Sequence, residues 1–271
     1  MSIPRMKQPM RPAMVWMVLL ASASPLPAAH RWKLVWSDEF AGKEQSRPDP
    51  SRWTYDLGAG GWGNQEQERY TDSLSNAHLD GKGRLVISAQ RLSAPEITSA
   101  RLKTKGKFEI AYGRIEGRIR LPSGHGVWPA FWMLGSDVDE PRIGWPACGE
   151  IDIVELIGRE PGRVHGTVHG PGYSGANGIG GYYDLPKGRQ FSDGFHVFAV
   201  EWSADAVQFF VDGVRYHVVT RSSLPANTRW VFDHPFFLIL NLAVGGLWPG
   251  PPDVTTQFPR EMVIDYIRVY R

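Results

Sequence analysis

The sequence GEIDIVELIG at residues 149–158 decides the fold, because its three carboxylates can share a role only in one kind of backbone. Ionised groups are costly to remove from water, so acids within a run of Ile, Val and Leu need a common purpose. On a helix, Glu150, Asp152 and Glu155 would spread around the axis. On a strand, Glu150 and Asp152 share a face, and a β-bulge of one residue brings Glu155 to that face as well. The stretch therefore predicts a bulged strand whose isoleucines point to the core.

The rest of the chain from Trp32 onward also reads as β-structure. Short alternating segments recur between turns rich in Gly, Pro, Asn and Asp, and a helical period is rarely seen. Asp212-Gly213 between two such segments is a strong hairpin signal. Residues 236–244 (FFLILNLAV) are apolar on both faces, as in a central strand. No linker or repeat divides residues 30–271, so we predict one all-β sandwich of two antiparallel sheets.

Composition narrows the class of ligand. The chain has 271 residues, a formal net charge of +2, 11 Trp and 30 Gly, and this charge favours neither nucleic acid nor an anionic membrane as a partner. Exposed aromatic rings suit a sugar ligand, since the C–H faces of a pyranose pack on flat rings, although any single Trp is more often in the core. Cys148 is the only cysteine, which excludes an intramolecular disulfide and fits a small buried thiol better than a nucleophile.

The N-terminal residues have the layout of a secretory signal peptide. Three basic side chains precede an apolar run at residues 13–21 (AMVWMVLLA), and small residues and prolines follow. The run is too short for a stable transmembrane anchor. We expect a signal peptide over residues 1–29, cleaved between about 23 and 29, and a secreted or periplasmic protein without a membrane contact after its removal.

Two glutamates on one bulged strand suit glycoside hydrolysis. A retaining enzyme needs a nucleophile and an acid/base whose carboxyl groups lie ~5–5.5 Å apart, whereas an inverting enzyme needs ~6.5–9.5 Å. Asp152 between them could hydrogen-bond the nucleophile and raise the pKa of its neighbours as a like charge. The spacing of Glu150 and Glu155 alone leaves both mechanisms open, and also a solvated strand face without a catalytic role.

Residues 145–155 (WPACGEIDIVE) resemble the active-site signature of glycoside hydrolase family 16, in the laminarinase-like branch with a bulged E-x-D-x-x-E motif. The resemblance extends from Val35 to Tyr270 and includes WPAFWMLG at 128–135, GTVHG at 166–170 and NLAVGG at 241–246. It implies a β-jelly-roll, similar to concanavalin A, whose concave sheet forms the substrate cleft. It also implies that Glu150 is the nucleophile, Asp152 its partner and Glu155 the general acid/base, and that no cofactor takes part in catalysis.

The resemblance further implies a set of substrate-binding residues. Trp128 and Trp132 share a strand face and Trp248 lies in a Gly/Pro loop, so all three are candidate sugar contacts, while a core position stays open for one of the first two. Asn64 matches a substrate-binding Asn of the family, and Arg101 matches an arginine near the non-reducing subsites, although an ordinary surface arginine is an alternative. His169 is expected in the cleft near Glu155. His165 and His169 are spaced like a helical zinc pair, but they alternate as in a strand, so a zinc site is not expected and His165 is assigned a structural role.

Asp265 is a separate candidate site, since it occupies an otherwise apolar face of the C-terminal segment. By resemblance, Asp265, Glu39 and the carbonyl of Gly83 match a structural calcium site, which suits the oxygen ligands that calcium prefers. A salt bridge from Asp265 to a nearby arginine is an equal alternative.

Together these features predict a secreted, monomeric endo-β-glucanase that cleaves β-1,3 bonds in laminarin-like glucans with retention. A transglycosylase is one alternative, since the same glutamates would serve it, and a hydrolase of mixed-linkage glucan or galactan is another. The alternative of a different class is a glucan-binding, lectin-like protein, which is expected to lack one or both catalytic carboxylates.

Overall fold

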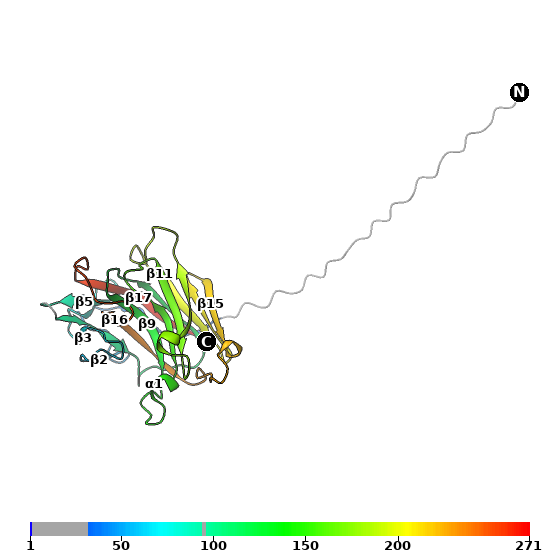
Figure 1. Cartoon of the computed structure of the whole chain (residues 1–271). Coiled ribbons are helices and arrows are strands. Elements are labelled where there is room, and N and C mark those ends of the chain that lie inside the picture. The colour runs from blue at the N-terminus through cyan, green and yellow to red at the C-terminus, as the bar shows by residue number, and fades with distance from the viewer. Residues whose placement is uncertain (2–31, 94–95) are drawn as a thin grey trace. The chain divides into compact units, whose positions relative to one another are not determined.

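The computed structural model describes Met1 and residues 32–93 and 96–271. The predicted signal peptide therefore lies outside the described residues apart from Met1, and its cleavage stays a prediction. Residues Trp32–Arg271 pack as one unit, drawn in Figure 1. In the described part of the chain, no helix has the length and apolar character needed to cross a bilayer.

The first of two sheets contains ten strands. Its hydrogen-bonded order is β15 (Val214–Thr220), β14 (Ala206–Val211), β13 (His196–Trp202), β8 (Gly113–Arg120), β17 (Arg260–Tyr270), β5 (Leu85–Arg91), β6 (Ile97–Ser99) and β3 (Glu68–Tyr70). Two further strands, β1 (Leu34–Asp38) and β4 (Ala77–Leu79), pair with β17 and β5. All pairs are antiparallel except β3 with β6.

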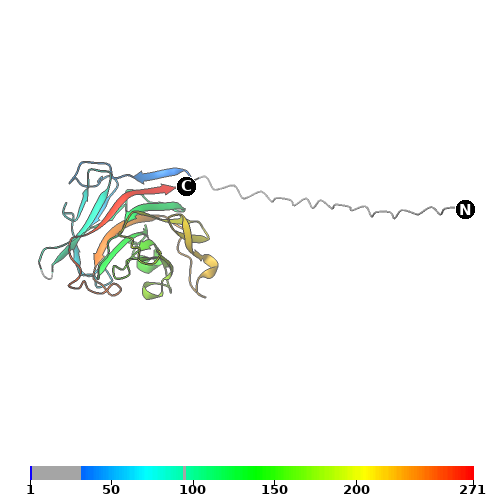
Figure 2. The same ribbon diagram turned by 90° about the horizontal axis from the view of Figure 1, so that it is seen from above.

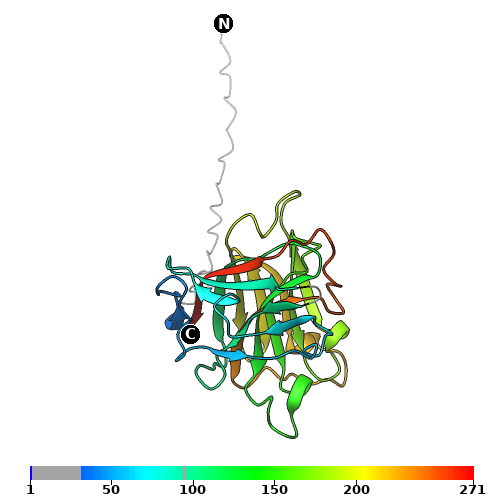
Figure 3. The same ribbon diagram turned by 90° about the vertical axis from the view of Figure 1, so that its left-hand side faces the viewer.

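The second sheet contains seven antiparallel strands and carries the acidic motif. Its order is β12 (Ile179–Asp184), β11 (Arg163–His169), β10 (Glu150–Glu155), β9 (Val127–Gly135), β16 (Phe236–Val244), β7 (Arg101–Lys103) and β2 (Thr54–Asp56). The helical turns in the described residues are short, namely α1 (Gly144–Ala147) and the 3₁₀ turns Gly175–Asn177 and Arg221–Ser223. Figures 2 and 3 show the two sheets as packed layers with curved strands.

The core lies between the two sheets and is built from alternate residues of their strands. Ile151 and Ile153 of β10 pack in the same buried cluster as Ile115 and Ile267 of the other sheet. Because side chains alternate across a strand, the polar neighbours of these residues on β10 point to the outer face of the seven-stranded sheet. Gly117 permits close approach of the layers, since a Cβ there would lie 3.1 Å from Cε1 of Phe131 on β9 of the other sheet.

The sequence-based expectations for the strands are confirmed. All nine residues of β16 are buried, as expected of a central strand. Asp212 and Gly213 connect β14 to β15 with positive φ angles of 50° and 80°, which suits the tight hairpin predicted from this dipeptide. The all-β fold of two sheets predicted from alternation is therefore observed.

Candidate active site

The bulge predicted in β10 is present. Asp152 lies opposite Trp132 on β9, and Glu155 lies opposite Ala130, so three steps along β10 match two along β9. The pairing with β11 shifts over the same interval. The extra residue places Glu155 on the same face as Glu150 and Asp152. The sheet therefore gathers all three carboxylates on its outer face.

Each glutamate accepts a hydrogen bond from a tryptophan. Nε1 of Trp145 donates to Oε2 of Glu150 over 2.7 Å, and Nε1 of Trp128 donates to Oε1 of Glu155 over 3.0 Å. Trp145 belongs to α1, where its own backbone departs from helical geometry with φ −82° and ψ 140°. Trp145 was not predicted as a site residue, although it opens the matched signature at residues 145–155. The indoles fix the orientation of both carboxyl groups.

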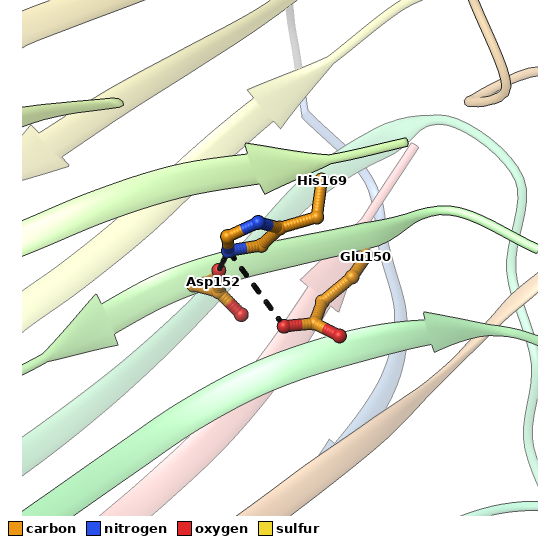
Figure 4. A group of neighbouring side chains, drawn as sticks. All are labelled: Glu150, Asp152 and His169. Carbon is orange, nitrogen blue, oxygen red and sulfur yellow. Dashed lines mark ion pairs between the residues drawn. The ribbon is translucent and has the colours of Figure 1, made fainter. Parts of the chain in front are cut away.

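Asp152 and His169 form the inner part of the cluster (Figure 4). Nε2 of His169 lies 3.0 Å from Oδ2 of Asp152 and 3.8 Å from Oε1 of Glu150. The Asp152 side chain is 3% exposed and that of Glu150 is 17% exposed, so water reaches Glu150 much more readily. The ligand atoms of these three residues lie within 4.8 Å of one another and could also hold a cation, but the imidazole already lies against Asp152.

The register specifies the position of His169 within the carboxylate cluster. On β11 it is His165 that lies opposite Glu155, whereas His169 lies opposite Glu150. The bulge causes this arrangement because it sets the spacing between the two ends of β10. His165, assigned only a structural role from the sequence, thus shares the face of the carboxylates. Its position could be predicted only with the register known.

Burial changes the proton affinity of all three acids. It raises the pKa of Glu150 to about 8, with the charge of Asp152 as the next cause. It also raises the pKa of Asp152 to about 8. For Glu155, burial and then the charge of Asp152 hold the pKa well above its usual range. Neighbouring carboxyls of this kind share protons, which is the condition for one to act as an acid while another is ionised.

Comparison with known proteins agrees with this geometry. Residues 66–268 match the sequence profile of glycosyl hydrolases family 16. The chain belongs to glycosyl hydrolases family 16. Over 286 residues it is 43% identical to a β-glucanase from Rhodothermus marinus, with 100% of this chain and 98% of the relative covered.

Solved structures of family members share the fold. The laminarinase catalytic domain from Thermotoga maritima MSB8 is 52% identical, with a TM-score of 0.82 over 89% of this chain and 98% of that domain. An endo-β-1,3-glucanase from Pyrococcus furiosus is 50% identical, with a TM-score of 0.82 over 88% of this chain and 94% of that structure. The two-sheet fold of this glycosyl hydrolase is accordingly the jelly-roll implied by its signature.

Trp132 of this family 16 chain lies at the centre of a polar network on the outer face. Its Nε1 donates to Oδ1 of Asn241 over 2.7 Å, and Nδ2 of Asn241 donates to Oη of Tyr70 over 3.0 Å. Trp132 and Trp128 are both half-buried, so neither occupies the core position left open for one of them. Asn241 and Tyr70 were not predicted as site residues, since nothing in their local sequence indicates that they meet across β16 and β3.

Arg101 is held in place by its neighbours and is not a free surface side chain. Its Cζ lies 4.8 Å from the ring centroid of Trp132 and 5.0 Å from that of Trp62, so the guanidinium is flanked by two indoles. Nε donates to Oδ2 of Asp56 over 3.0 Å. The side chain of Arg101 is 14% exposed. These contacts fix the guanidinium beside Trp132.

Asn64 is exposed and is linked to the same network through Glu66. Nδ2 of Asn64 donates to Oε1 of Glu66 over 3.2 Å, and Oη of Tyr70 donates to Oε2 of Glu66 over 3.0 Å. Because Tyr70 contacts Asn241, the loop that carries Asn64 is tied to the strand beside Trp132.

Trp248 lies beside the other end of the acidic motif. Its ring is 5.6 Å from that of Trp128 and 5.0 Å from that of His165, in edge-to-face geometry in both cases. The neighbouring Leu247 is 69% exposed. Trp248 therefore packs next to the indole that holds Glu155, and its role in sugar contact stays a prediction.

The arrangement at the predicted calcium site favours the salt-bridge alternative. Asp265 accepts from Nη1 of Arg118 at 2.6 Å, and Glu39 is paired with both Nε and Nη2 of Arg268 at 2.9 Å. Gly83 does lie near Glu39, since a Cβ on Gly83 would be 3.6 Å from the Glu39 carbonyl oxygen. Both carboxylates are thus paired with guanidinium groups, and a calcium ion at this position stays a prediction from the resemblance.

Cys148 is fully buried in a small cluster with Leu134, Phe237 and Ile239. Burial raises the pKa of its thiol to about 12, so the reactive thiolate is not available near neutral pH. The interpretation of Cys148 as a packed thiol agrees with the structure.

Proposed function

We propose that this chain is an endo-β-1,3-glucanase that hydrolyses laminarin-like glucans with retention. The observation that carries the proposal is the bulge, which puts Glu150 and Glu155 on one face with an indole donor on each. The related proteins named above, a β-glucanase, a laminarinase and an endo-β-1,3-glucanase, support the substrate class.

In the proposed reaction, the ionised Glu150 attacks the anomeric carbon while Glu155 donates its proton to the leaving glycosidic oxygen. The bond from the anomeric carbon to that oxygen breaks, and a glycosyl ester forms on Glu150. Glu155, now a carboxylate, then takes a proton from water, whose oxygen attacks the anomeric carbon and releases Glu150. The raised pKa of Glu155 suits the acid, because the proton is retained until the leaving oxygen needs it.

Glu150 must be ionised to act, and the structure contains groups that favour this state. Trp145 donates a hydrogen bond to its carboxylate, which stabilises the charged form. Asp152 can take the proton that the pair shares, since burial also raises the pKa of Asp152 to about 8. Asp152 and His169 thus act as positioning and charge-balancing residues beside the nucleophile.

The direct test is release of reducing sugar from laminarin. We expect activity in the wild type and loss of it, by about 10³-fold or more, in Glu150→Ser and Glu155→Ala. Glu261→Ala on the ten-stranded sheet is the matched control and should behave as wild type. Inactivity of the wild type across a panel of β-glucans, or full activity of Glu150→Ser, would contradict the proposal.

The stereochemistry and the rival activities have their own readouts. NMR of the first product should show the β-anomer, and an initial α-anomer would mean inversion. Products longer than the substrate would favour transglycosylation. Faster release of reducing sugar from mixed-linkage glucan or galactan would make that polymer the preferred substrate. Binding of laminarin without turnover would favour a lectin-like protein.

Export and a monomeric state are further parts of the proposal, and a structural calcium is an alternative to the salt bridges of Glu39 and Asp265. N-terminal sequencing of the exported protein should find a start between about residues 23 and 30. Light scattering should give the mass of one chain. Calcium would need Glu39 and Asp265 to leave their arginine partners, and its test is given in the Discussion.

A further inference from the structure

Tyr182 shares the face of the catalytic carboxylates at the far edge of the seven-stranded sheet. The register places it opposite His165, which in turn lies opposite Glu155. The next residue, Tyr183, packs against the core, so alternation directs Tyr182 outward. One row of side chains therefore runs from Glu155 through His165 to Tyr182.

The ring of Tyr182 is both exposed and held in place. It is 56% exposed, and Cζ of Arg163 lies 4.1 Å from its centroid. Arg163 is itself fixed by two hydrogen bonds to Asp184, of 2.7 and 2.8 Å. The guanidinium covers one face of the ring, and the exposed part of the side chain leaves area for a ligand. An orientation fixed before binding lowers the entropic cost of stacking.

Glycine residues before Tyr182 leave the outer face of β12 without bulky side chains. Gly180 lies opposite Thr167 on the outer face, and a Cβ there would be 2.7 Å from Oγ1 of Thr167. Gly178 lies against the ring of His169, since a Cβ there would be 2.4 Å from its Cε1. Tyr182 is thus the large apolar side chain that β12 presents to the site.

The position of Tyr182 indicates which part of a glucan it meets. β12 is two strands from β10, about 10 Å at ~4.8 Å per strand. Arg101, which matches an arginine near the non-reducing subsites, lies on β7 on the opposite side of β10. A polysaccharide that crosses the strands would therefore place its leaving-group sugars towards Tyr182.

We propose that Tyr182 is a stacking platform for a pyranose ring of the leaving group, beyond the sugar that contacts Glu155. This inference rests on the proposed endo-glucanase function. An exposed tyrosine on an edge strand is also simply a good strand former. The continuous row from Glu155 through His165 and the bare outer face of Gly180 favour the platform.

The experiment uses β-1,3-oligosaccharides of increasing length, labelled at the reducing end, with Tyr182→Ala and Tyr182→Phe. We expect Tyr182→Ala to lower kcat/KM by about 5- to 10-fold on laminarin and long oligosaccharides, and to leave the shortest cleaved substrates unchanged. Its cleavage pattern should lose the preference for bonds with several sugars on the reducing-end side. Tyr182→Phe keeps the ring and should behave as wild type.

Tyr266→Ala is the matched control, because the ten-stranded sheet repeats the arrangement. Cζ of Arg268 lies 3.8 Å from the Tyr266 ring, and Arg268 is paired with Glu39. Tyr266→Ala should leave every substrate unaffected. An active wild type with an unchanged Tyr182→Ala variant, or a loss in that variant that does not depend on substrate length, would overturn the platform. An inactive wild type would instead overturn the proposed function.

Discussion

Nε1 of Trp145 lies 2.7 Å from Oε2 of Glu150, so the turn before β10 holds the first residue of that strand by its carboxylate. Trp145 is itself 49% exposed, and its ring lies 6.4 Å from that of His169. The orientation of the proposed nucleophile thus depends on a residue that lies outside the sheet.

Trp145→Phe should move the acidic limb of the pH profile. Loss of the N–H donor destabilises ionised Glu150 and raises its pKa, so kcat/KM should reach its plateau at a higher pH, by about 0.5–1 unit. Below that pH we expect a loss of about 3- to 10-fold. The measurement is kcat/KM on laminarin between pH 4 and pH 9.

Trp128→Phe is the paired variant for that experiment. It removes the donor to Glu155, so the alkaline limb should move to higher pH and the acidic limb should stay. If both variants moved the same limb, the division of roles between Glu150 and Glu155 would be wrong.

Glu150→Gln should stabilise the protein at alkaline pH. The pKa of Glu150 is about 8 in the folded protein against 4.5 ordinarily, so between these values the folded state binds more protons than the unfolded state. The wild type therefore loses stability as pH rises through this window, whereas the neutral amide does not titrate. We expect a gain of at least about 1 kcal/mol at pH 9, or about 2–4 °C in melting temperature, and little difference at pH 4.5.

Thermal unfolding of Glu150→Gln and wild type across pH checks this expectation. Glu261→Gln serves as the control, since Glu261 is exposed on the other sheet. Equal melting temperatures of Glu150→Gln and wild type at pH 9 would contradict the burial of an acid at this position.

Asn241→Ala should weaken substrate binding through Trp132. It removes the acceptor of the Trp132 indole and the donor to Tyr70, and a buried polar group left unpaired costs about 1–3 kcal/mol. With Trp132 no longer oriented, we expect KM for laminarin to rise about 3- to 10-fold with a smaller change in kcat. Kinetics and a melting curve of the same variant separate the effect on substrate binding from the effect on stability. An unchanged KM would show that Asn241 does not position Trp132.

Removal of calcium should not change stability. Asp265 is paired with Arg118 and Glu39 with Arg268, so their charges are balanced without a metal. We expect the same melting temperature with chelator, with added Ca²⁺ and with neither. A decrease with chelator that Ca²⁺ restores, and that Asp265→Ala abolishes, would instead establish the calcium predicted from the resemblance.

Local patterns in the sequence predicted much of the fold and the common face of the three acids. Alternation in segments such as residues 236–244 predicted strands because a half-buried or buried strand needs apolar residues at fixed positions. The bulge was predicted from Glu155. In a regular strand this carboxylate would point to the core, where its desolvation would be too costly. The contacts of Asn241 could not be found this way, because they join β16 to residues more than 100 positions away, and the place of His165 depends on the register between β10 and β11.

The sequence by itself determined the all-β class, the bulged strand and the family of this protein, because alternation and a short motif are local properties of the chain. Only the tertiary structure decided that His169 lies opposite Glu150 and His165 opposite Glu155, and that Arg268 and Arg118 engage the acids expected to bind calcium. The physical reason is that strand register and ion pairs are set by packing and charge balance over the whole domain, which no short stretch of sequence specifies. Trp145 stands in the motif, but only the tertiary structure shows that its indole N–H donates to Glu150.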